Sequence, residues 1–172
     1  MRGVDVSAKD DDWMQDLDMD EWNFIDSHET PTDIPGVFAD PTWSELFRRY
    51  AETDFAENEY NFYLAVADYE NSPSRERGSQ MYQIFVAPGA PSEVNLQGPT
   101  VAALREWFGY DMSEWTSNLD PSEEDQARFE KGTVTDPPAD VFAAARKDVT
   151  VNLSDVYLRW ILAVSKAQKR TH

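Results

Sequence analysis

Cysteine is absent from this chain of 172 residues, so it can form no disulfide, no thiol nucleophile and no thiolate metal site. Histidine occurs only as His28 and the terminal His172, which argues against a histidine-based triad or metal site. A phosphate-binding loop is missing as well, because Gly78-Ser79 lacks the further glycines and the lysine of such a loop. The sequence therefore predicts no cofactor, no metal site and no catalytic centre.

Long apolar runs are also missing. No stretch approaches the ~18 uninterrupted apolar residues of a membrane span, and Met1–Asp12 carries four aspartates where a signal or transit peptide would be apolar or basic. The sequence predicts a soluble cytoplasmic protein, which a partner could recruit to the inner face of the plasma membrane. Sustained period-2 alternation is absent too, and this favours an all-α fold.

Basic residues are scarce, with 15 against 33 acidic ones and a formal charge of −18. This balance disfavours binding to nucleic acid or to an anionic membrane surface, and it favours a basic partner surface. Carboxylates such as Glu123 and Asp125 could in principle do acid–base work or hold a divalent cation. A solvated acidic surface is the favoured interpretation, because the aspartate-rich runs lack the glycine and the final glutamate of a Ca²⁺ loop.

The acidic residues are concentrated at the start of the chain. Residues 1–40 hold twelve of them against Arg2 and Lys9, and the helix breakers Pro31, Pro35 and Gly36 lie before Asp40-Pro41. We therefore predict an acidic, aromatic-containing segment over 1–40 and a domain over 41–170. The apolar residues of the segment could supply a first helix that packs on the domain, or form a disordered motif that folds on a basic partner. They are Trp13, Met14, Leu17, Trp22, Phe24 and Ile25.

Helical periodicity begins at Asp40-Pro41, where an aspartate can cap the first free amides and a proline suits the first turn. Trp43, Leu46, Phe47 and Tyr50 then share one helical face. A second helix over 56–70 carries a broad apolar face that includes Tyr60, Phe62, Tyr63, Leu64, Val66, Ala67 and Tyr69.

Further helices follow along the chain. A helix with a polar start near Pro73 carries Met81, Ile84 and Phe85 and ends at residues 87–91, and another opens at Pro99 and ends at Gly109. Residues 110–136 form an acidic interruption, in which Asp120-Pro121-Ser122-Glu123 predicts a short helix. Helical order resumes at Pro137-Pro138, and the last helix is predicted from about Ser154.

Three separate segments of the chain resemble the regulator of G-protein signalling (RGS) family. They are Phe55-Ala56-Glu57-Asn58-Glu59-Tyr60-Asn61-Phe62-Tyr63, Glu93-Val94-Asn95-Leu96 and Ser154-Asp155-Val156-Tyr157-Leu158-Arg159-Trp160. The last matches the family spacing Asp-x-Tyr-x-Arg-aromatic, and the likeness covers about Pro41 to Ala167. It implies a bundle of about nine helices with an insertion at about 110–136.

The resemblance also implies a function. Members of the family bind the activated Gα subunit of a heterotrimeric G protein, in its GTP-bound or transition-state form. They accelerate GTP hydrolysis by stabilising the Gα switch regions, without contributing a catalytic group. The chain is thus expected to be a GTPase activator rather than an enzyme. Some relatives are scaffolds without this activity, and that alternative stays open here.

The resemblance assigns the partner-binding residues. Asn95 would contact the Gα residues that position the attacking water, Asp155 would meet a switch backbone amide, and Arg159 would brace Asp155. The set is completed by Glu57, Asn58, Glu59 and Val151. One segment departs from the family pattern Ser-Glu-Glu-Asn, because Asn58 and Glu59 stand where glutamate and asparagine are expected. A glutamate there loses an amide donor and adds a charge, which opposes activity on ordinary Gα subunits.

Overall fold

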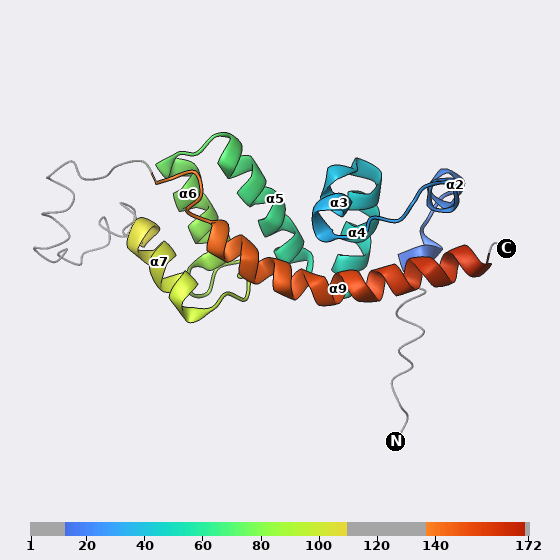
Figure 1. The fold of residues 1–172 in the computed structure, drawn as a ribbon. Coiled ribbons are helices and arrows are strands. Elements are labelled where there is room, and N and C mark those ends of the chain that lie inside the picture. The colour runs from blue at the N-terminus through green and yellow to red at the C-terminus, as the bar shows by residue number, and fades with distance from the viewer. Residues whose placement is uncertain (1–12, 110–136, 171–172) are drawn as a thin grey trace, which may run out of the picture. The chain divides into compact units, whose positions relative to one another are not determined.

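The computed structural model describes residues 13–109 and 137–170, and within these ranges it contains helices and no strands (Figure 1). The all-α prediction is confirmed. No helix in these ranges is long and apolar enough to cross a membrane. The short helix predicted from Asp120 lies outside the described residues. The elements are α2 (Met19–Ser27), α3 (Ile34–Ala39), α4 (Pro41–Thr53), α5 (Glu57–Asn71), α6 (Arg75–Met81), the π-helix η1 (Tyr82–Val86), α7 (Gly98–Phe108) and α9 (Ala143–Arg170).

The predicted start of α4 is confirmed in atomic detail. The Asp40 carboxylate accepts hydrogen bonds from the backbone amides of Thr42 (2.8 Å) and Trp43 (3.2 Å). Pro41 occupies the first turn, where a missing N–H leaves no intrahelical bond unmade. The local signals alone therefore position this helix.

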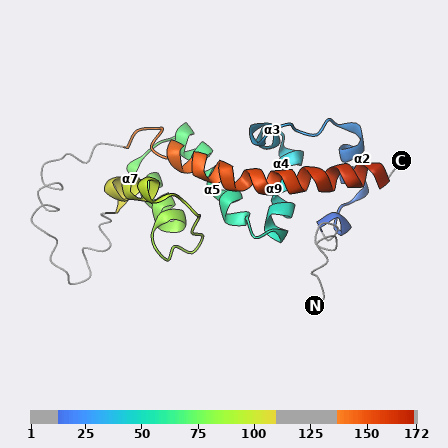
Figure 2. The same cartoon turned by 60° about the horizontal axis from the view of Figure 1, so that its bottom comes forward.

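The last two predicted helices are a single helix, so the predicted start near Ser154 is wrong. Helix α9 runs unbroken from Ala143 to Arg170 (Figure 2). The Ser154 hydroxyl donates to the Thr150 carbonyl at 2.7 Å, one turn back, instead of capping a new helix. Because no glycine or proline lies between Val149 and Ser154, nothing interrupts the backbone ladder there.

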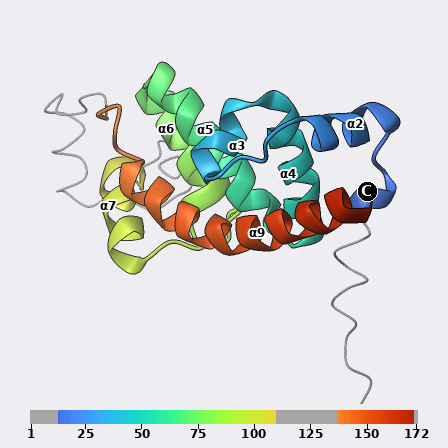
Figure 3. The same cartoon turned by 45° about the vertical axis from the view of Figure 1, so that its right-hand side comes forward.

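The described residues form two compact units. The first unit combines residues 13–60 with 150–170, and the second contains residues 61–109 and 137–149. In the first unit, α4 lies beside the C-terminal part of α9 (Figure 3), where Trp160 packs edge-on against Trp43 and tilted against Phe47. The Tyr157 hydroxyl donates to the Pro31 carbonyl at 2.6 Å, which ties α9 to the segment before α3.

The second unit is built around Phe142, which is fully buried just before α9 begins. Its ring stacks on Phe108 of α7 at 5.5 Å and meets Tyr69 of α5 edge-on at 4.9 Å. The Phe108 ring also lies directly against Gly78, where an added Cβ would collide with it. Glycine is therefore required at position 78 to let α6 approach α7 this closely.

The buried face of α5 is narrower than its sequence suggests. Phe62, Val66 and Tyr69 are buried, whereas Leu64 and Ala67, predicted on an apolar stripe, are exposed. The buried residues and the exposed ones are both apolar and both recur at helical spacing. The sequence pattern alone therefore could not show which of the two groups faces the core.

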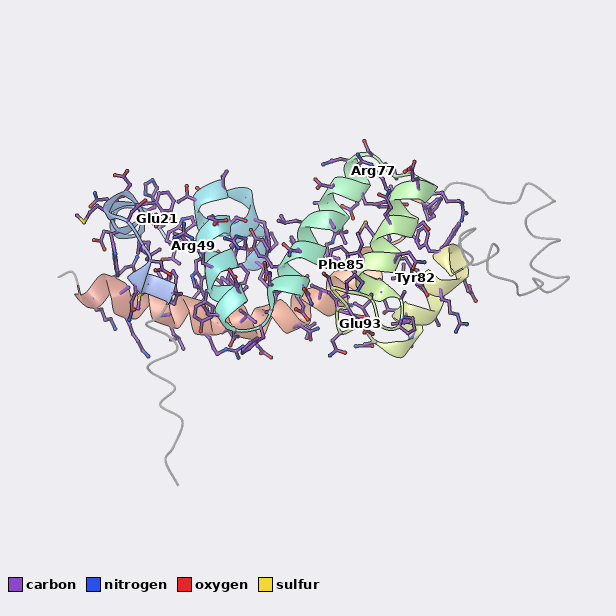
Figure 4. All side chains as sticks on the ribbon, turned by 180° about the vertical axis from the view of Figure 1, so that it is seen from behind. Glu21, Arg49, Arg77, Tyr82, Phe85 and Glu93 are labelled. Atoms are coloured by element: carbon purple, nitrogen blue, oxygen red, sulfur yellow. The ribbon has the colours of Figure 1, made fainter. Side chains whose placement is uncertain are left out.

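Residues 13–40 of the acidic segment are part of the first unit and pack on α4, as the first of the segment's two interpretations expects. Trp13, Met14 and Ile25 are buried. Glu21 is central to this packing: it completes a capping box with Asp18 and forms a two-point ion pair with Arg49 of α4, at 2.8 and 3.1 Å. Figure 4 shows the two side chains facing one another.

Glu21→Ala is expected to lower the free energy of unfolding by about 1–2 kcal/mol, because it removes both the cap and the ion pair. Urea unfolding measures this change. Asp20→Ala is the matched control, since it removes one negative charge from the same helix turn at an exposed position. Equal effects of the two substitutions would contradict the role given to Glu21.

Candidate partner-binding site

The connection between α4 and α5 closes as a Schellman motif. The Ala56 amide donates to the Ala51 carbonyl at 2.8 Å, five residues back, and the Phe55 amide donates to the Glu52 carbonyl at 3.3 Å. Such a motif needs one residue in the left-handed region, usually a glycine. Here that residue is Phe55, with a φ of 58°.

The side chain of Phe55 in this conformation is exposed to solvent. It is the most exposed large apolar side chain among the described residues, at 88%. A bulky side chain in the left-handed region costs about 1–2 kcal/mol relative to the right-handed one. A residue that is both strained and exposed is a candidate for partner binding.

An ion pair holds this connection against α9. The guanidinium of Arg159 donates to one carboxylate oxygen of Asp54 through Nη2 and through Nε, the latter at 3.2 Å. The hydrogen bond to Asp54 raises the pKa of Arg159, with a smaller contribution from the charge of Asp155. The pair therefore fixes residues 54–55, and with them the start of α5, relative to this part of α9.

Glu57, Asn58 and Glu59 form the first turn of α5, and all three are half-buried. Negative charges are favoured in this turn, because the free backbone amides and the helix dipole are positive there. Glu59 thus has a structural reason to be acidic that does not depend on a partner.

Val151, Asp155 and Arg159 follow one another at intervals of four residues along α9, and all three are exposed. They lie on one side of the helix, as the spacing requires. Arg159 was expected to brace Asp155, but its ion pair is with Asp54, 105 residues away in sequence. The structure therefore joins the α9 residues to the residues before Glu57, both within the first unit.

Asn95 lies in the second unit, exposed on a loop between η1 and α7. The loop is held before and after this residue. The Val94 amide donates to the Phe85 carbonyl at 2.9 Å and the Val94 side chain is buried, while the Gln97 amide donates to the Asp148 carboxylate at 3.1 Å. Backbone restraints on both sides limit how far the Asn95 side chain can move, which suits a recognition residue.

Asp54 and Phe55 are not among the residues that the resemblance assigns to partner binding. One signal was available: Phe55 falls outside the apolar stripe of α4 at 43, 46, 47 and 50, yet it stands directly before the next helix. The Asp54–Arg159 pair had no local signal, because its partners are far apart in the chain.

No group of three histidine, cysteine or carboxylate side chains that could hold a metal ion occurs in the part of the chain that the structure describes. The candidate residues of the first unit and Asn95 of the second unit offer hydrogen-bond donors and acceptors, one aromatic ring and several carboxylates. This chemistry is suited to recognising a protein surface.

Comparison with known proteins gives one family. The model described as "Regulator of G protein signaling domain" matches residues 34–159, nearly three quarters of the chain. The match begins inside the N-terminal segment, at the start of α3, and ends at Arg159.

Individual relatives match over shorter stretches. The chain is 42% identical to regulator of G-protein signaling 7 from Bos taurus over 60 residues, 33% of this chain and 13% of that protein. It is 35% identical to human regulator of G-protein signaling 6 over 63 residues, 35% of this chain and 13% of that protein. Against mouse regulator of G-protein signaling 10 it is 28% identical over 69 residues, 38% of each. The chain thus spans well under half the length of each of these relatives.

Proposed function

This chain belongs to the RGS domain family, and we propose that it binds the activated Gα subunit of a heterotrimeric G protein and accelerates GTP hydrolysis. The observation that carries the proposal is the Asp54–Arg159 ion pair, which joins an exposed, strained Phe55 and the 57–59 turn to α9. Family membership supplies the partner class, and this geometry supplies a surface prepared for one. The protein would act in the cytoplasm, where its partner resides.

The mechanism is stabilisation of the partner's switch loops. The side chain of Asn95 offers both a donor and an acceptor, so it can support the Gα groups that orient the attacking water without adding charge. Asp155 offers an exposed carboxylate that can accept from a switch amide. The Asn95 loop and residues 54–55 are already restrained before binding. Less conformational entropy is therefore lost when they hold the Gα switches in the reactive shape.

Glu59 favours a second candidate, an RGS-like scaffold that binds without activating. Its carboxylate stabilises the start of α5, but at an interface it would need a basic partner group to offset the loss of water. The two candidates differ in their preference among Gα states. A transition-state stabiliser must bind the transition-state analogue form more tightly than the GTP-analogue form, whereas a scaffold need not.

Single-turnover GTP hydrolysis by a panel of Gα subunits tests the proposal. The wild-type chain is expected to accelerate hydrolysis, Asn95→Ala to reduce that acceleration at least about tenfold, and Glu59→Asn to increase it several-fold. Asn71→Ala, an exposed asparagine at the end of α5, is the control for Asn95→Ala. If the wild type gives no acceleration on any Gα and Glu59→Asn gains it, the scaffold function replaces the activating one.

A further inference from the structure

One side of α9 in the first unit stays exposed although it is partly apolar. We call it the α9 face; Val151, Leu158 and Leu162 on it are 64%, 59% and 62% exposed. Their spacing of seven and then four residues places them along one stripe of the helix. Three exposed aliphatic side chains in one stripe form a surface that is typical of a helix–helix contact. The α9 face consists of Val151, Asp155, Leu158, Leu162, Lys166 and Lys169.

The charges on the α9 face differ from those elsewhere in the first unit. Arg48, Arg49 and Arg159 are each engaged in ion pairs with carboxylates of the same unit. Lys166 and Lys169 make no ion pair with any residue in the described ranges. Together with Asp155 they give this face a local charge near +1, in a chain that carries −18 overall.

The order of these residues makes the α9 face complementary to itself. From Val151 to Lys169 the face presents one aliphatic residue, one acidic residue, two leucines and then two lysines. If a second α9 lies antiparallel, centred between Leu158 and Leu162, the leucines of the two copies meet at the centre. Asp155 of each copy then lies opposite Lys166 of the other, about 16 Å along the helix from its own Lys166. The Val151 methyl groups would lie against the stem of the other copy's Lys169.

We propose that the α9 face is an isologous docking surface for a second copy of this chain. Antiparallel helices packed at a shallow angle, about 8–10 Å apart, bring all of these pairs within reach. A different protein would have to reproduce the same order of charges in reverse, which a second copy does by symmetry. The contact is small and joins two strongly acidic chains, so the dimer is weak and strengthens as salt screens the general repulsion.

Dimerisation has a consequence that rests on the proposed function. Val151 and Asp155 belong both to the α9 face and to the residues assigned to Gα binding. A second copy would cover them, so dimer formation and Gα binding compete. The protein would then be least active where it is most concentrated.

Sedimentation of the full chain, from about 1 to 500 μM and at two salt concentrations, tests the docking without any Gα present. We expect a monomer–dimer equilibrium that Leu158→Ser and Leu162→Ser each weaken at least tenfold. Leu64→Ser, an exposed leucine of the second unit, is the matched control and should leave the dimer unchanged. Thermal unfolding of the variants confirms that these exposed positions leave the fold intact.

Charge exchange tests the register. Asp155→Lys and Lys166→Asp alone each place like charges opposite one another, and both should weaken the dimer. Mixing the two single variants restores opposite charges at both ends, so a heterodimer should form more tightly than either homodimer. A monomer at all concentrations, or a dimer insensitive to the leucine variants and to mixing, overturns the proposal. If the wild-type chain forms the dimer but activates no Gα subunit, the proposed function is refuted and the docking proposal is not.

Discussion

Phe55→Gly is expected to weaken binding to activated Gα at least tenfold while making the isolated chain more stable. The two effects have opposite signs because they have different causes. Binding loses a large, exposed aromatic side chain, the kind of residue that dominates protein interfaces. Stability gains because glycine adopts a φ of 58° without the steric penalty that phenylalanine carries.

The stability gain can be bounded from the motif. Relief of the left-handed conformation contributes about 1–2 kcal/mol, and the greater freedom of glycine in the unfolded chain offsets about 0.4–1 kcal/mol of it. Because Phe55 is 88% exposed, little packing is lost. A net increase of up to about 1.6 kcal/mol in the free energy of unfolding follows, measurable as a higher urea midpoint at constant slope.

Phe55→Ala separates the two causes. Alanine also lacks the ring but keeps the Cβ that opposes a positive φ, so we expect the loss of binding without most of the stability gain. Binding is measured with Gα held in its transition-state-analogue form. Unchanged affinity in both variants would remove Phe55 from the partner surface, and a stability loss in Phe55→Gly would mean that the ring packs more than its exposure indicates.

Trp160→Ala is expected to lower the free energy of unfolding by about 3–5 kcal/mol, the largest stability effect we predict for a single side chain. Trp160 is fully buried and contacts both Trp43 and Phe47, so its removal leaves a cavity between α4 and α9 within the first unit. In a domain of ordinary stability such a loss unfolds a measurable fraction of the molecules.

Trp160→Phe is the informative control. The buried Nε1 of Trp160 has no hydrogen-bond partner among the described residues. Phenylalanine removes this unsatisfied donor, which offsets part of the packing lost with the smaller ring. Urea unfolding should therefore place Trp160→Phe much nearer to wild type than Trp160→Ala. A loss below about 1 kcal/mol for Trp160→Ala would show that the surrounding side chains close the cavity.

The features that could be predicted from the sequence alone are those that depend on residues close together in the chain. The start of α4 follows from Asp40 and Pro41, whose capping and φ preferences act within one turn. The all-α fold follows from periodicity, and the family from three short motifs. Each of these signals is contained in a few consecutive residues.

The parts that sequence did not predict depend on tertiary choices. Serine both caps helices and bonds back to the preceding turn, so Ser154 gave no means of telling a new helix from a continuous one. Arg159 has a carboxylate four residues away and another 105 residues away, and only the fold shows that it pairs with Asp54. The exposure of Phe55 is likewise poorly predicted by a pattern that treats every aromatic residue as core, although Phe55 falls outside the apolar stripe of α4.

Because η1 is a π-helix, the number of residues in this segment matters as much as their identity for the position of the loop that follows. The Ala87 amide reaches back five residues to the Tyr82 carbonyl, and the carbonyls of Ile84 and Phe85 accept from Ser92 and Val94. Deleting one residue from Tyr82–Val86 would restore the α-helical repeat and turn everything after it by about 100°. The carbonyls of Ile84 and Phe85 would then no longer meet the amides of Ser92 and Val94. The loop would lose the hydrogen bonds that position Asn95.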